Sequence, residues 1–340
     1  MHCYRNIGLI AAAILCLAAP PLQAGNTTTL PAAVADHHLH IQGPAVTAEL
    51  KRMIWRSPEL LAASVFRPAI FRERTGPDAL RVLDEARIGQ GVLLSEAYMF
   101  ASPLAAADKD LNVARLTREE NAFNVRAALA SRGRLAAFIS VNPLWPQAIG
   151  EVRYWAGKPG VTGVKLHLAN SGFRPGSPKD VATLAKFVDQ ARELDLPLVI
   201  HVRNAAAYSR VDAEVFIDRV LSHAGALPVQ VAHAGGWGGI DEPTLAALGA
   251  YADAIARRAP GTQALTFDLA VTALGRNSDA RTLARFVALM RRIGLRRFVL
   301  GSDWPAVDPG QNNAELEAEL PLTPAEWRQI LSNPATYLRH

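Results

Sequence analysis

The chain has 340 residues, 50% of them hydrophobic and 20% charged, which is ordinary globular composition. Although this length exceeds that of most single domains, some α/β folds reach it as one unit. The formal net charge of +5 does not indicate a nucleic-acid partner, because the arginines are scattered among acidic residues in helical stretches and form no basic block.

The first 24 residues predict a secretory signal. Arg5 is followed by an almost wholly apolar run at Ile7–Ala19, and a small residue precedes a cleavage point expected at Gly25. The run is short for the alternative, a permanent membrane anchor. We therefore expect a mature protein that is periplasmic or secreted and has no stable membrane association after cleavage.

Both cysteines of the chain, Cys3 and Cys16, lie in this predicted signal. The mature chain would then have no thiol, no disulfide and no thiolate ligand. Any metal must be bound by nitrogen and oxygen atoms, so the candidate ligands are His, Asp and Glu.

In chain order, apolar runs of strand length alternate with longer segments of helical period. Runs such as LPLVI and RRFVL are continuously apolar, which is typical of parallel strands covered on both faces. The predicted strands are Val34–His40, Gly91–Ser95, Ala136–Val141, Thr162–Leu168, Pro197–Val202, Pro228–His233, Ala264–Leu269 and Arg297–Asp303. The predicted helices between them include Pro77–Ile88, Thr117–Arg132, Asp180–Leu194, Ala213–His223, Pro243–Arg258 and Asp279–Ile293.

Eight strands alternating with helices predict an α/β fold, a (β/α)8 TIM barrel, with residues 25–340 as one domain. The alternative is an open doubly wound sheet, but its Gly-rich phosphate loop is missing after the first strand, which reads DHHLHIQGP. A long insertion, Ile41–Glu73, separates the first strand from the helix that leads to the second. Because it carries several aromatic residues, we interpret it as a partly helical cap over the barrel mouth rather than a disordered loop.

The first predicted strand carries two histidines in metal-ligand spacing. Side chains alternate across a strand, so His38 and His40 project to the same side. Two imidazoles at the end of a strand can share one ion at ~2.1 Å each. Taken alone, this pair is weak evidence.

Further polar groups stand where other buried strands end. His201, His233 and Asp303 each follow an apolar run. In a barrel these positions meet at the carboxyl-terminal mouth, where barrel enzymes have their active sites. A lone histidine or aspartate at such a position is more often structural, but four strand ends with such groups favour a functional site.

Three neutral imidazoles and one carboxylate suit one divalent ion, with Zn²⁺ favoured and Mn²⁺, Fe²⁺, Co²⁺ or Ni²⁺ left open. Such an ion lowers the pKa of a coordinated water towards ~7. We expect His38, His40, His201 and Asp303 to bind it. Asp303 would also accept the proton of the water, and His233 would polarise a substrate carbonyl or protonate a leaving group.

The same residues, in this order, resemble the amidohydrolase superfamily, and in particular the amidohydrolase-related branch that includes aminocarboxymuconate-semialdehyde decarboxylase. The matching phrases run from Val34 to Leu338 and are DHHLH, GVKLHLANSGF, LPLVIHVRN, VQVAHAGG, RFVLGSDWP and ILSNPATYL. The resemblance implies the same four metal ligands and His233 as the catalytic histidine. It also places Lys165 where binuclear members carry a carboxylated lysine. We favour one metal with Lys165 unmodified.

Other polar or aromatic side chains at strand ends could bind substrate. Besides Lys165, the candidates are Asn142, Arg203, whose guanidinium could hold a carboxylate, and Trp304. Weaker candidates for the pocket wall are Glu96, His167, Asn204 and Trp237.

The leading functional hypothesis is a metal-dependent hydrolase of a small carboxylic amide, lactone or ester. Non-oxidative decarboxylation of an unsaturated or aromatic acid at the same site is the alternative, and the predicted export favours hydrolysis. An exported binding protein without catalysis is a third hypothesis, which the presence of all five site residues disfavours. The expected partner is a small-molecule substrate, and the sequence leaves open whether the chain forms a homo-oligomer.

Overall fold

The computed structural model describes residues 30–56, 72–272 and 278–338. The predicted signal at residues 1–24, with both cysteines, lies outside the described residues, as does the middle of the predicted cap. Among the described residues, no helix is both long and apolar enough to cross a bilayer.

Eight parallel strands form one sheet in the order of the chain. The ring closes where β8 returns to β1: Leu39 and Trp304 form a parallel bridge, His37 N donates to Leu300 O at 2.9 Å, and Asp303 N donates to His38 O at 2.8 Å. This confirms the predicted (β/α)8 barrel. The strands are β1 (Ala35–Leu39), β2 (Gln90–Leu94), β3 (Leu135–Ser140), β4 (Val161–His167), β5 (Leu198–His201), β6 (Val229–Val231), β7 (Leu265–Asp268) and β8 (Phe298–Val299).

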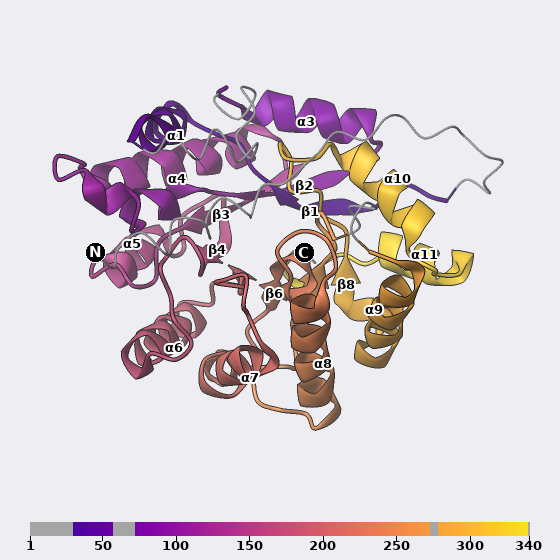
Figure 1. Cartoon of the computed structure of the whole chain (residues 1–340). Coiled ribbons are helices and arrows are strands. Elements are labelled where there is room, and N and C mark those ends of the chain that lie inside the picture. The colour runs from indigo at the N-terminus through magenta and orange to yellow at the C-terminus, as the bar shows by residue number, and fades with distance from the viewer. Residues whose placement is uncertain (1–29, 57–71, 273–277, 339–340) are drawn as a thin grey trace.

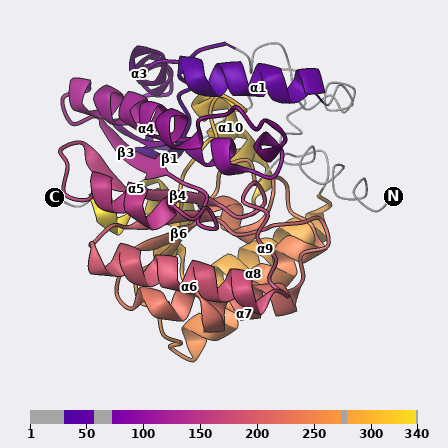
Figure 2. The same ribbon diagram turned by 90° about the vertical axis from the view of Figure 1, so that its left-hand side faces the viewer.

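Helices surround the strands (Figure 1). A quarter turn away, α1 and α4 lie on one side of the strands and α6 and α7 on the other (Figure 2). The helices are α1 (Pro44–Arg56), α3 (Gly76–Glu85), α4 (Val113–Ala130), α5 (Ala148–Trp155), α6 (Pro178–Glu193), α7 (Arg210–Arg219), α8 (Glu242–Ala256), α9 (Ala280–Ile293), α10 (Pro309–Glu319) and α11 (Pro324–Leu331). Three of them begin at a capping box, which satisfies their first backbone N–H groups: Thr75 with Asp78, Ser209 with Asp212, and Thr323 with Glu326.

The barrel interior has an apolar layer beneath a polar one. Val199 and His201 are two residues apart on β5, so both point to the same face, and His201 lies nearer the carboxyl end of the strand. Val199 belongs to a buried group that we call the lower cluster: Val92, Leu94, Phe138, Val199, Val299, Ala335 and Tyr337. The lower cluster therefore supports the carboxyl-terminal mouth from below.

Five observed strands are shorter than predicted, and two of them differ most. The strand predicted at Arg297–Asp303 pairs only at Phe298–Val299, because the chain then turns and Asp303 adopts a left-handed backbone with φ of 63°. The strand predicted at Pro228–His233 ends at Val231 and continues as a 3-10 turn, η7 (Ala232–Gly235). As a result, His233 and Asp303 lie at the mouth, past the last paired residues of β6 and β8.

The described part of the predicted cap contains α1. Val46, Leu50 and Met53 of this helix pack against the 3-10 turn η4 (Ala97–Ala101) and the start of α4, whereas Trp55 is 87% exposed. The helical part of the interpretation is therefore seen, and its role as a cover for the mouth stays a prediction.

Candidate metal centre

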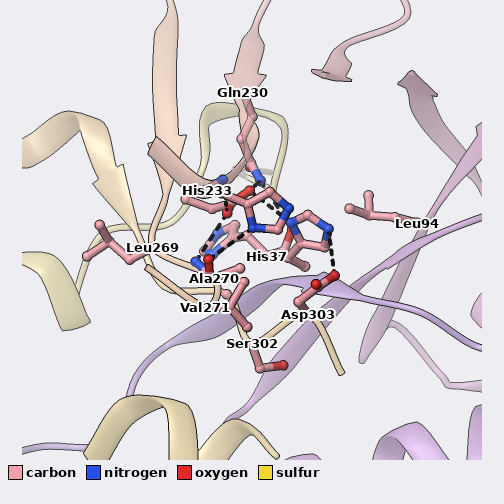
Figure 3. A network of polar contacts seen from close by, with 12 residues as sticks. His37, Leu94, Gln230, His233, Leu269, Ala270, Val271, Ser302 and Asp303 are labelled. Atoms are coloured by element: carbon pink, nitrogen blue, oxygen red, sulfur yellow. Dashed lines mark hydrogen bonds and ion pairs between the residues drawn. The ribbon is translucent and has the colours of Figure 1, made fainter. Parts of the chain in front are cut away.

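Strand ends bring the predicted ligands of β1 and β8 together. His38 lies in β1 and His40 follows it directly, while Asp303 follows β8 by four residues. The two histidines are buried, and the Asp303 side chain is 18% exposed. Figure 3 shows Asp303 with its dashed contact to a neighbouring imidazole.

The outer ring nitrogens of both histidines are occupied by acceptors. His38 Nδ1 donates to Asp268 Oδ2 at 3.1 Å, and His40 Nδ1 donates to Leu94 O at 2.6 Å. A proton on Nδ1 leaves a lone pair on Nε2 of a neutral imidazole. Both Nε2 atoms turn towards Asp303 Oδ1, at 3.3 Å from His38 and 3.2 Å from His40.

Three acceptor atoms that face one another in this way fit a cation. Ligands at ~2.1 Å from a tetrahedral ion lie ~3.4 Å apart, close to the two observed distances, and His38, His40 and Asp303 form one of the ligand groups among the described residues. Burial holds the pKa of His38 well below its ordinary value, which keeps this ring neutral and able to bind metal. Burial raises the pKa of the Asp303 carboxyl, but His38, His40 and His233 together outweigh burial and hold this pKa well below its ordinary value, so the carboxyl is ionised.

His40 responds to the same carboxylate. Burial lowers its pKa, but the hydrogen bond to Asp303 and the negative charges of Glu96 and Asp303 together outweigh burial, and the net pKa is raised. A proton and a cation therefore compete for the space between His40 and Asp303.

His201, at the end of β5, lies outside that three-residue group. Its Nε2 is buried and has no hydrogen-bond partner among the described residues. Its ring stacks on His167, with centroids 4.0 Å apart and planes at 9°, because the two residues are in register on β4 and β5. A buried, unpartnered ring nitrogen suits a metal ligand, since such atoms rarely stay unsatisfied.

His233 lies just past β6 with a left-handed backbone, φ 52°, which is uncommon for a residue other than glycine and is found at functional sites. Its Nδ1 donates to Ala270 O at 3.0 Å, so Nε2 carries the lone pair. Its ring centroid is 4.7 Å from that of His38 and 5.0 Å from that of His201. The structure therefore places His233 beside the candidate ligands.

Sequence reasoning missed Asp268, the last residue of β7. Besides His38 Nδ1, this carboxylate accepts from His233 N at 2.8 Å and Gln230 Nε2 at 2.7 Å. A second candidate ligand group contains His38, His233 and Asp268. The sequence does contain a signal for this residue, because Asp268 is a polar residue at the end of an apolar strand. It was missed because the predicted strand ran one residue further, to Leu269.

The amidohydrolase family model matches residues 35–338. The chain belongs to the amidohydrolase family. Enzymes of this family bind metal, which agrees with the donor atoms described above.

Solved structures with the same fold include different enzymes. This amidohydrolase is similar to 5-carboxyvanillate decarboxylase from Sphingomonas paucimobilis, with a TM-score of 0.62, 13% identity, and 88% of this chain and 97% of that chain covered. A probable 2-pyrone-4,6-dicarboxylic acid hydrolase from Acinetobacter baumannii gives a TM-score of 0.57 and 16% identity, with 91% and 100% covered. 2,6-Dihydroxybenzoate decarboxylase from Rhizobium gives 0.54 and 15%, with 91% and 98% covered. A comparison with curated proteins finds no match.

In this amidohydrolase, Lys165 of β4 is buried and its Nζ lies 3.3 Å from His38 Nε2. Burial lowers the pKa of this amine to about 8. The predicted substrate-binding lysine therefore lies at the candidate metal centre, as does Glu96, whose Oε2 is buried without a partner among the described residues and whose pKa is raised by burial.

The other predicted substrate-binding residues are occupied by contacts within the chain. The Arg203 guanidinium pairs with Asp241 at 2.9 Å, and its remaining N–H groups donate to Thr244 Oγ1 and to backbone carbonyls. Asn142 Nδ2 donates to Ala101 O at 2.7 Å. Trp304 is buried, and the Arg74 guanidinium lies 5.7 Å from its ring centroid. We therefore leave Arg203 and Asn142 out of the proposal below.

Proposed function

We propose that this amidohydrolase is a metal-dependent hydrolase of a small carboxylic amide, lactone or ester. One divalent ion, with Zn²⁺ favoured, would be bound by His38, His40, His201 and Asp303. One observation carries the proposal: at the mouth of the barrel, the Nε2 atoms of two buried histidines, His38 and His40, face the Asp303 Oδ1 at 3.3 and 3.2 Å.

When bound, the ion lowers the pKa of water and polarises a carbonyl. The residues around the site transfer protons and bind the substrate. Asp303 is ionised and can accept the proton of the attacking water. His233 holds its Nδ1 proton on Ala270 O and so presents Nε2 to the substrate, where it can transfer a proton to the leaving group. The Lys165 amine can pair with a carboxylate of the substrate.

Decarboxylation is the second candidate, because the buried Lys165 amine beside His38 can hold a substrate carboxylate near the centre. Two of the three solved structures described above carry decarboxylase names. The fold does not choose between the two reactions.

The deciding experiment offers the Zn²⁺-loaded protein two substrate panels. One contains small esters, lactones and amides with a carboxylate, and the other contains unsaturated and aromatic acids. Acid release is followed in a pH-stat and CO₂ in the headspace. We expect hydrolysis that is lost in His233→Ala and kept in His223→Ala, because the His223 side chain is exposed and, among the described residues, bonds only to Asp189. Release of CO₂ without a hydrolysed product would contradict hydrolysis, and turnover of neither panel would favour the non-catalytic binding protein.

The location is also a proposal. The signal-like segment at residues 1–24 supports export to the periplasm or beyond. Peptide mapping of the mature protein tests it, and a mature chain that retains Arg5 would contradict it.

A further inference from the structure

The lower cluster contains one polar atom that reaches upwards, the hydroxyl of Tyr337. This residue lies in a 3-10 turn, η9 (Thr336–Leu338), near the end of the described chain. Its ring packs edge-on against Phe138 with centroids 4.9 Å apart, and the side chain is buried. Val92, Phe138 and Val199 of the lower cluster each lie two residues before the end of their strand. Tyr337 therefore packs in the barrel beneath the strand ends that carry the metal centre.

The Tyr337 hydroxyl donates to Gln230 Oε1 at 2.5 Å. This contact fixes which way the Gln230 amide points, since Nε2 must then face the other way. Gln230 Nε2 donates to Asp268 Oδ2 at 2.7 Å and to His37 O at 3.2 Å. Gln230 is fully buried, so no solvent can replace these contacts. Figure 3 shows Gln230 with its dashed contacts above His233 and His37.

The same Asp268 oxygen accepts the Nδ1 proton of His38. A continuous series of hydrogen bonds therefore runs from Tyr337 through Gln230 and Asp268 to His38, a candidate metal ligand. Carboxylates that accept from a metal-bound histidine fix its tautomer and the direction of its lone pair.

His37 ties the same carboxyl-terminal segment to β1. Its Nδ1 donates to Leu300 O at 2.9 Å, and its Nε2 accepts from Ala335 N at 3.0 Å. The backbone of Ala335 and the hydroxyl of Tyr337 are thereby held against the strand that carries His38.

We propose that Tyr337 is a positioning residue for the metal centre: from beneath the strand ends, its hydroxyl orients Gln230 and, through Asp268, the ligand nitrogen of His38. The inference rests on the proposed function, because it needs the metal centre. A partner that contacts a metal ligand directly is worth about 10- to 100-fold in metal affinity. Tyr337 is two residues further from the ligand, so its effect should be smaller. We expect its removal to lower the metal affinity by about 3- to 10-fold.

The experiment measures metal affinity rather than turnover. The dissociation constants for Zn²⁺ are determined by chelator competition for the wild-type chain, Tyr337→Phe and Gln230→Leu. Tyr251→Phe is the matched control, because Tyr251 is also fully buried but its hydroxyl has no partner among the described residues. Thermal unfolding of each metal-free protein is recorded in parallel, and the visible spectrum of the Co²⁺-loaded protein reports ligand geometry.

We expect weaker Zn²⁺ binding and an altered Co²⁺ spectrum in Tyr337→Phe, a larger loss in Gln230→Leu, and wild-type affinity in Tyr251→Phe. In the double variant, Tyr337→Phe should add nothing to Gln230→Leu, because Tyr337 acts through Gln230. Wild-type affinity in Tyr337→Phe, or additive losses in the double variant, would overturn the inference and leave the metal centre standing. A wild-type chain that binds no metal would overturn the proposed function itself, and the inference with it. If Gln230→Leu does not fold, the Zn²⁺ affinities of Tyr337→Phe and Tyr251→Phe still decide whether Tyr337 supports the metal centre.

Discussion

The two ends of the barrel satisfy their polar atoms in opposite ways. At the carboxyl-terminal mouth, two imidazole lone pairs face a carboxylate, and the Nε2 of His201 has no partner among the described residues. Towards the other end, the Tyr337 hydroxyl is hydrogen-bonded to Gln230 within the apolar lower cluster, and both ring nitrogens of the nearby His37 are hydrogen-bonded. Folding alone favours the second arrangement, because unpartnered buried groups cost stability. The mouth is therefore the end at which a ligand is expected, and the other end is where stability is expected.

The largest effect should come from His233, which is expected to act in catalysis without binding the metal. His233→Asn should lower kcat by about 10²- to 10⁴-fold, the usual contribution of a general acid or base. The bound metal should stay at the wild-type ratio. Steady-state kinetics and elemental analysis of the same preparation measure both, and an unchanged kcat would remove His233 from the mechanism.

A change in the lower cluster should act on stability and leave the mouth in place. Phe138 is fully buried, so Phe138→Ala should reduce the free energy of unfolding by about 3–5 kcal/mol. Its metal-to-protein ratio at saturating Zn²⁺ should remain that of the wild type. Urea unfolding measures the loss against Leu129→Ala, an exposed control expected within about 0.5 kcal/mol of the wild type. Equal losses in the two variants would contradict this division between the ends.

Asp268 connects the two ends, so its removal should weaken metal binding without abolishing it. Asp268→Asn replaces an acceptor of the His38 Nδ1 proton, and we expect the dissociation constant for Zn²⁺ to rise about 10- to 100-fold. Asp189→Asn is the control, because Asp189 makes the equivalent contact to the exposed His223 at 2.9 Å. Chelator competition measures the Zn²⁺ dissociation constant of both variants, and only that of Asp268→Asn should rise. Equal affinities would show that Asp268 does not support the metal centre.

The smallest effect concerns a buried carboxyl beside the mouth. Glu120 Oε1 accepts from Gly43 N at 3.2 Å, and burial raises the pKa of this carboxyl from 4.5 to about 8. Between these values the folded chain holds a proton that the unfolded chain has released, so this group makes stability fall as the pH rises. Glu120→Gln should therefore lose less stability between about pH 5 and about pH 8 than the wild type.

Urea unfolding at the two pH values tests this, with Glu119→Gln as the control, because Glu119 is the exposed neighbour on the same helix. The control should keep the pH dependence of the wild type. The same pH dependence in Glu120→Gln would show that Glu120 is ionised in the folded chain.

Local pattern was enough to predict the barrel and the strand ends that carry His38, His201, His233 and Asp303. Each strand is a short apolar run, and a polar residue at its end is visible without knowing the partners. The contacts that complete the centre are not local. Asp268 lies 230 residues from His38, and no spacing in the sequence connects them.

Contacts between residues distant in sequence also explain why Arg203 was predicted to bind substrate. A guanidinium at a strand end suits a carboxylate, but Asp241, 38 residues away, already occupies it. Gln230 and Tyr337, 107 residues apart, were likewise invisible, because one looks like part of a buried strand and the other like a terminal aromatic residue.

Metal content tests the central claim most directly. The wild-type chain, His38→Ala, Asp303→Asn and the surface control His223→Ala are loaded with Zn²⁺, separated from free metal and measured by elemental analysis. We expect roughly one ion per chain in the wild type and the control and less than about a tenth of that in the two ligand variants, because removing a ligand costs more than the 10- to 100-fold of an outer partner. A wild-type chain without bound Zn²⁺, or ligand variants that retain it fully, would contradict the account.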